Sequence, residues 1–162
     1  MNKKGFTLME VLIVVIIIAG LAAVTYPSYR TSIERARASE AVTMLGTIQA
    51  AQEKHFVNYE SYGEKFSDIN DFTPAIKDFN PSANFFRTEY FKYSLLKDSN
   101  SRRYAEARRT KGQQLVNKGY RLHAYYDEGF IRCKVLNNSE DGEKVCASLT
   151  DRAKVEDYYP IY

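Results

Sequence analysis

The strongest constraint on this chain is a long apolar segment close to its amino terminus. Within residues 6–29, FTLMEVLIVVIIIAGLAAVTYPSY, the only charged side chain is Glu10. A helix of this length rises about 36 Å, and about 20 apolar residues are enough to cross the hydrocarbon core of a bilayer. Residues 6–29 are therefore predicted to form a membrane-spanning helix.

Glu10 places a carboxylate inside the apolar segment, where a charged side chain is unfavourable. On insertion scales it costs on the order of 3 kcal/mol, so an acid in this position is usually retained for a partner. A secretory signal cut around Leu21-Ala22-Ala23, after its apolar stretch, is the alternative interpretation. The presence of Glu10 favours the interpretation that the helix stays in the mature protein. Glu10 is therefore a candidate functional residue.

The amino-terminal residues resemble the signature of type IV pilins and of the related pseudopilins. The matching features are Lys3-Lys4, Gly5-Phe6-Thr7-Leu8, Glu10, the uninterrupted apolar stretch, and Pro27. The resemblance implies cleavage between Gly5 and Phe6 by a prepilin peptidase and methyltransferase, N-methylation of Phe6, and retention of the helix. It also implies the α+β pilin fold, in which the second half of a long helix packs on a small antiparallel sheet of about four strands.

The resemblance further implies a structural subunit, without enzymatic activity or cofactor, that forms a homo-oligomer: a helical type IV pilus filament. Its precursor would lie in bacterial inner-membrane lipid, with Lys3 and Lys4 on the cytoplasmic side, and would reach the cell surface through an inner-membrane assembly platform. The resemblance leaves the role of the filament open among twitching motility, adhesion, DNA uptake and secretion. Two alternatives stay open: a pseudopilin or minor pilin of a type II secretion or DNA-uptake system, and a tethered binding protein that never polymerises.

The charge of Glu10 suggests how subunits would assemble. Cleavage before Phe6 leaves an α-ammonium about one helical turn from Glu10. When helices pack side by side, Glu10 of one subunit can meet the Phe6 amine of its neighbour, and in a low-dielectric bundle a paired charge costs much less than an unpaired one. We therefore expect this pair to set the axial step between subunits.

Two residues weaken the apolar helix. Pro27 has no amide hydrogen and clashes with the preceding turn, and Gly20 lowers helix propensity by about 1 kcal/mol relative to alanine. A kink near residues 23–27 is therefore expected. Unwinding between Gly20 and Pro27 on assembly is a sharper hypothesis, supported by the family resemblance.

The chain beyond the apolar segment predicts one small domain. Apolar residues recur at helical spacing, with charged residues such as Glu34 between them, at Ile33, Ala36, Ala41, Met44, Leu45, Ile48, Ala51, Gln52 and Phe56. Strand patterns and a hairpin turn at Asp127-Glu128-Gly129 follow, the strands at 90–96, 103–108, 120–126 and 130–136. The segments are thus a leader (1–5), a membrane and polymerisation helix (6–29), its amphipathic continuation (30–57), a connecting loop (58–89), and a sheet with a cysteine-bounded loop (90–162).

The only two cysteines are Cys133 and Cys146, separated by a turn-rich stretch. If oxidised, they close a loop of about 14 residues, which the chain-entropy treatment values at roughly 3 kcal/mol. Two unpaired buried thiols are the alternative. Many type IV pilins have a cysteine-bounded loop near the carboxyl terminus and major pseudopilins usually lack it, so the resemblance implies a disulfide and favours a pilin.

A dense group of cations invites a second functional interpretation. One acid, Glu106, and two tyrosines lie among cations that include Arg102, Arg103, Arg108, Arg109 and Lys111. Such a basic and aromatic patch could bind DNA, although a solvated surface is the more common role of a charge run. Catalytic patterns are missing from the sequence: His55 and His123 lie far apart, and no phosphate-binding loop or metal-ligand spacing accompanies them.

Overall fold

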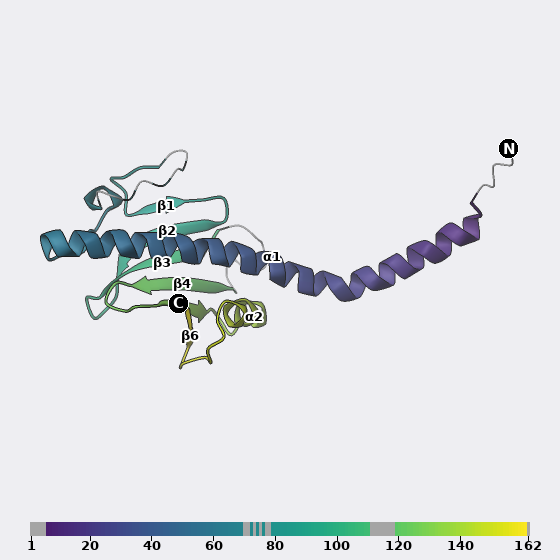
Figure 1. Cartoon of the computed structure of the whole chain (residues 1–162). Helices are drawn as coiled ribbons and strands as arrows, with labels where there is room; N and C mark the ends of the chain where they lie inside the picture. Colours follow the sequence, from purple (N-terminus) through teal and green to yellow (C-terminus); the bar gives the residue numbers. More distant parts are fainter. Residues whose placement is uncertain are drawn as a thin grey trace.

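The computed structural model describes residues 6–69, 72, 74, 76, 79–110 and 119–161. Its longest element is helix α1, Leu8–Tyr59, whose first half extends away from the rest of the chain and whose second half runs along a sheet (Figure 1). The other elements, in chain order, are η1 (Phe66–Asp68), β1 (Phe85–Arg87), β2 (Phe91–Lys97), β3 (Arg103–Arg109), β4 (Tyr120–Tyr125), β5 (Ile131–Val135), α2 (Glu140–Ser148) and β6 (Tyr158–Ile161). We call the sheet, α2, the loops and the second half of α1 the head.

The strands form one antiparallel sheet in the order β1-β2-β3-β4-β5-β6. The described residues thus contain six strands where the sequence predicts about four, while the α+β pilin layout is confirmed. The four predicted strands are β2 to β5, and the two extra strands are the edges. The sequence pattern does not predict the edges, because β1 has only three residues and lies inside the expected loop 58–89. Strand β6 contains Pro160, and proline within a sheet is confined to its edges.

Helix α1 packs closely on the two central strands because the facing side chains are small. Ala105 and Ala107 of β3 and Ala124 of β4 are fully buried, as are Ala38 and Ala41 of α1, and α1 contacts both strands. Alternation along each strand turns one set of side chains toward α1 and the other set away from it. The sheet therefore has an inner face under α1 and an outer face on the opposite side.

The buried side of α1 differs from the predicted one at its start. The helix buries residues three or four positions apart: Glu34, Ala38, Ala41, Leu45, Ile48 and Gln52. Glu34 was expected on the polar side and Ala36 on the apolar side, but Glu34 is buried and Ala36 is exposed. A carboxylate can take a core position here because it has charged and polar partners inside the head, described below.

The segment after α1 is fixed to the head by one amide and by aromatic rings. Gln52 accepts a hydrogen bond from the Gly63 amide at 2.8 Å and donates one to the Gly63 carbonyl at 3.1 Å. Phe66 packs against the ring of Phe86 in β1, with centroids 5.0 Å apart, and is itself almost completely buried. The connecting segment thus covers the β1 edge of the inner face.

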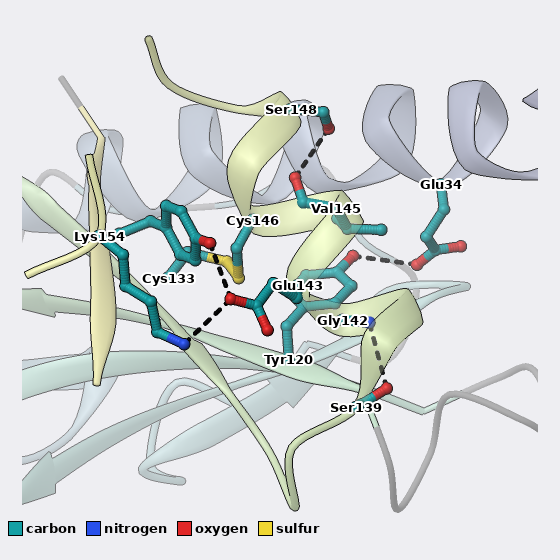
Figure 2. Close-up of a disulfide and its surroundings, with 11 residues drawn as sticks. Glu34, Tyr120, Cys133, Ser139, Gly142, Glu143, Val145, Cys146, Ser148 and Lys154 are labelled. Atoms are coloured by element: carbon teal, nitrogen blue, oxygen red, sulfur yellow. Dashed lines mark hydrogen bonds and ion pairs between the residues drawn. A yellow bond between two sulfur atoms is a disulfide. The ribbon is translucent and has the colours of Figure 1, made fainter. Parts of the chain in front are cut away.

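The cysteine-bounded stretch contains a helix that sequence analysis did not predict. Helix α2 begins after Ser139, whose hydroxyl accepts a hydrogen bond from the Gly142 amide at 3.1 Å, and its first turn holds three acids. Cap and acids are the ordinary signals of a helix start, and they were hidden in a segment that reads as turn-rich. The predicted disulfide is confirmed: Cys133 of β5 and Cys146 of α2 are bonded, with Cα atoms 5.5 Å apart (Figure 2).

Candidate assembly site and its attachment to the head

The first half of α1 is an unpartnered apolar rod. Every residue from 6 to 30 is exposed, including Leu8 at 88% and Val24 at 80% of its accessible surface. Among the described residues, α1 is the one helix long and apolar enough to cross a membrane, and its most apolar stretch makes no buried contact with the head. A large exposed apolar surface of this kind marks a site of protein–protein or membrane interaction.

Glu10 lies in the first turn of this rod. The Thr7 hydroxyl caps the helix by accepting a hydrogen bond from the Glu10 amide at 3.2 Å. Thr7 and Glu10 have the spacing of a capping box, in which a threonine cap is followed three residues later by a glutamate. The cap fixes where the helix begins, so the Glu10 backbone lies about one turn beyond Phe6.

The helix remains continuous through Gly20 and Pro27. The ribbon of α1 bends between its free end and the head (Figure 1), and the helix contains Pro27. A proline bend is the expected cause, since Pro27 offers no amide to the carbonyl one turn earlier. The Thr25 hydroxyl also donates a hydrogen bond to the Leu21 carbonyl at 3.0 Å, a contact that often accompanies helix bending. Unwinding between Gly20 and Pro27 on assembly stays a hypothesis.

Glu34 is the first buried residue of α1, where the helix enters the head. Its carboxylate receives two hydrogen bonds from the Arg109 guanidinium, Nε to Oε1 at 2.5 Å and Nη2 to Oε2 at 3.0 Å. The Tyr120 hydroxyl donates to Oε1 at 2.9 Å, as Figure 2 shows, and Arg37 donates to Oε2 at 3.3 Å. Three elements, α1, β3 and β4, are therefore joined at one carboxylate.

The charges of this network are compensated inside the head. Burial alone would raise the pKa of Glu34, but the hydrogen bonds and charge of Arg109, helped by Tyr120 and Arg37, lower that pKa overall. Burial and the neighbouring Glu34 carboxylate raise the pKa of Tyr120, so its hydroxyl stays protonated and donates. Arg109 also donates to the Tyr90 carbonyl at 3.1 Å. The network is a charged joint between the rod and the sheet.

The predicted cation patch is not one surface. Arg109 is 2% exposed and paired with Glu34, so its expected place on a DNA-contact surface is wrong. Arg102 pairs with Asp98 at 3.1 Å and Glu128 at 3.3 Å, and Arg103 pairs with Glu64. Arg108 is exposed on the outer face, and Lys111 lies outside the described residues. Sequence proximity grouped these cations, but alternation along β3 sends Arg108 and Arg109 to opposite faces.

The two histidines have separate environments. His55 Nδ1 lies 2.7 Å from the Ser61 carbonyl near the end of α1, whereas His123 Nε2 lies 3.2 Å from the Glu106 carboxylate in the sheet. Within the described ranges no cluster of three metal-capable side chains occurs.

Comparison with known proteins shows what this amino terminus is similar to. Residues 1–26 match the family model described as the prokaryotic N-terminal methylation motif. The motif covers the Gly5-Phe6 junction, Glu10 and most of the apolar rod, which are the residues that carry the resemblance to type IV pilins.

Curated relatives confirm that resemblance. The chain is 37% identical over 62 residues to the type IV major pilin protein PilE1 of Neisseria gonorrhoeae, covering 38% of each chain. It is 39% identical over 69 residues to the fimbrial protein of Moraxella nonliquefaciens (43% of this chain, 42% of that protein). It is 39% identical over 64 residues to the type IV major fimbrial protein FimA of Dichelobacter nodosus (40% of this chain, 41% of that protein).

The matched segment thus spans about two fifths of the length of these curated relatives. No solved structure matches the chain. Pilins and fimbrial proteins are structural proteins, which agrees with the expectation that the chain is not an enzyme. The long helix on an antiparallel sheet has the α+β layout of the pilin fold.

Proposed function

We propose that this chain is the subunit of a type IV pilus filament and polymerises through the first half of α1. The observation that carries the proposal is the exposure of the entire apolar segment 6–29, with one acid inside it. Side-by-side packing of such rods keeps their apolar surface out of water once the subunits leave the bilayer, and exposing that surface would cost about 25 cal/mol for each Å². Lipid would cover the same surface in the precursor, before assembly.

In this proposal a prepilin peptidase cuts between Gly5 and Phe6 and the new amine is methylated. Glu10 of one subunit then pairs with the Phe6 amine of its neighbour. The Thr7 cap supports this role because it fixes the start of the helix and hence the position of both charges. Extraction from the inner membrane by an assembly platform follows, and the head, connected through the Glu34 joint, ends on the outside of the filament.

The test replaces Glu10 by leucine in the full-length precursor. It measures cleavage and membrane insertion of the chain, and the yield of the chain in filaments. The Glu10→Leu chain should be cut and inserted in the membrane as before, yet its yield in sheared filaments should fall at least tenfold. Glu40→Leu is a matched control, since Glu40 is an exposed acid on the same helix, within the head. Normal filament yield for Glu10→Leu would contradict the proposed pairing.

Filament preparations also separate the alternatives. A major subunit is the abundant chain in purified filaments, a minor pilin or a pseudopilin is present in traces, and a tethered binding protein is absent. Mass spectrometry of the same material reports the amino-terminal residue and its methylation. An uncut, dispersed chain would contradict the proposal as a whole.

A further inference from the structure

The outer face of the sheet carries a row of five cations that the sequence does not show as a group. Strand register pairs Arg87 of β1 with Lys92 of β2, Lys92 with Arg108 of β3, Arg108 with Arg121 of β4, and Arg121 with Lys134 of β5. Each member is thus directly opposite the next. We call these five residues the cation row.

The row is turned away from α1. On all five strands its members are preceded or followed by fully or almost fully buried inner-face residues: Phe86, Phe91, Ala107, Leu122 and Cys133. Arg87 and Arg108 are exposed, and the side chains of Arg121 and Lys134 retain 35% and 45% of their accessible surface. In a filament whose core is made of α1 helices, this face would point outward.

Five aligned cations are costly for the sheet. Neighbouring strands lie about 4.8 Å apart, so the row extends about 19 Å, and like charges directly opposite one another repel. Two members have acidic partners: Arg121 pairs with Glu106 at 3.1 Å and Lys134 with Asp157 at 2.5 Å. Among the described residues, no ion pair is formed by Arg87, Lys92 or Arg108, so the row keeps a positive excess.

Ring contacts do not remove this excess. Lys92 Nζ lies 4.2 Å from the centroid of the Phe85 ring, and the Arg87 guanidinium lies 5.4 Å from the same centroid. These contacts hold the side chains over the sheet, but they leave the charge in place. A repulsive arrangement of this kind is stabilised when a linear polyanion lies along it.

We propose that the cation row binds the phosphate backbone of double-stranded DNA, without base specificity. A duplex carries one charge per about 1.7 Å of its axis, so about eleven phosphates fall within the length of the row. Guanidinium groups, which make up three of the five members, match phosphate geometry particularly well. A polysaccharide with one acidic group in each pair of sugars offers a much lower charge density over the same length.

The neighbouring rings favour duplex over single-stranded DNA. Tyr104 and Tyr125 stack on each other with centroids 4.9 Å apart, and the guanidinium groups of Arg102 and Arg132 lie 4.5 and 4.9 Å from the Tyr125 ring. Ring faces occupied in this way are not platforms for unpaired bases, which single-strand binding requires. Backbone contact is what remains, and it is common to all sequences.

The test measures binding of a 30-base-pair duplex to the full-length chain in nonionic detergent micelles, by fluorescence anisotropy over a series of salt concentrations. The logarithm of the association constant should fall linearly with the logarithm of the salt concentration. The magnitude of this slope should not exceed about 4.5 for five phosphate contacts. Arg108→Gln should reduce the magnitude of the slope by about 1 and weaken binding about eightfold at 0.1 M salt. The double variant Arg87→Gln/Arg108→Gln should weaken it about sixtyfold.

Lys144→Gln is the matched control, because Lys144 is an exposed cation on α2 and its loss changes the net charge equally. Its slope and affinity should equal those of the unchanged chain. The proposal is overturned by salt-insensitive or absent DNA binding, by equal losses for the Lys144 and Arg108 variants, or by binding to an acidic polysaccharide alone. Dispersed chains are used, so this result does not depend on filament formation.

Discussion

Glu34 and Arg109 are 75 positions apart in the sequence and form a buried, two-bonded ion pair where α1 enters the head. The pair fixes the rotation and the height of α1 relative to β3, because a shift of one residue would turn Glu34 away from the guanidinium. In the proposed filament, subunits that pack through one half of α1 carry their heads in a constant orientation. The Glu34–Arg109 pair would provide this orientation, because it fixes the head relative to α1.

Removing one member of this pair should be far more harmful than removing both. Arg109→Met leaves the Glu34 carboxylate buried without its main partner and should cost about 3–5 kcal/mol of head stability. The double variant Glu34→Leu/Arg109→Met should recover much of that loss, because no unpaired charge remains. Denaturant unfolding of the full-length chain in micelles, followed by tyrosine fluorescence since Trp is absent, measures both values. Strictly additive losses would mean that the two side chains act independently.

Acid should weaken the head through the same carboxylate. The pKa of Glu34 is lowered in the folded chain, because burial, which acts in the opposite direction, is outweighed by Arg109, Tyr120 and Arg37. Its contribution is therefore complete well above the ordinary value of 4.5 and is lost as the pH falls through the lower folded pKa. Unfolding free energies measured from pH 7 to pH 3 should fall less steeply for Glu34→Gln. Identical profiles would assign the acid sensitivity to other groups.

Features of this fold that depend on residues close together in the sequence can be predicted from it, and features that depend on distant residues cannot. Periodic apolar residues predict α1 and the four central strands, since those patterns depend on local alternation and on one buried face. The burial of Glu34 depends on Arg109 and Tyr120, which are distant in sequence, so a helical pattern alone places this glutamate in solvent. The cation row has the same origin, because its five members come from five strands and only the register aligns them.

The disulfide between Cys133 and Cys146 should stabilise the attachment of α2 to β5. The bond closes a loop with a sequence separation of 13. Replacing both cysteines by serine should lower the free energy of unfolding by about 3 kcal/mol through loop-closure entropy. Comparison of the double serine variant with the oxidised and reduced parent chain measures this loss. Reduction without any effect on the unfolding midpoint would show that α2 is held by its packing alone.

Gly142 should tolerate no side chain. A Cβ at this position would lie 2.4 Å from the carbonyl oxygen of Gly119, the residue directly before β4, so Gly142→Ala forces the two backbone segments apart. Its cost, about 1–3 kcal/mol for overpacking, exceeds the gain of about 1 kcal/mol in helix propensity. Gly46→Ala is the control, because Gly46 is an exposed position of α1 with nothing within 4 Å, and this change should raise stability. Equal effects of the two changes would place Gly142 away from β4.

Arg108→Gln should stabilise the head while it weakens the proposed DNA binding. Arg108 is directly opposite Lys92 and Arg121, and its removal takes away two like-charge neighbours, worth a few tenths of a kcal/mol each. The gain should shrink in 1 M salt, where the screening length is about 3 Å. Thermal unfolding at low and high salt measures the effect, with Arg103→Gln as the contrast, since Arg103 is paired with Glu64 and its loss should give no such gain. If Arg108→Gln lowers the stability of the head, the cations of the row do not repel one another. No electrostatic cost would then remain for an anionic partner to relieve.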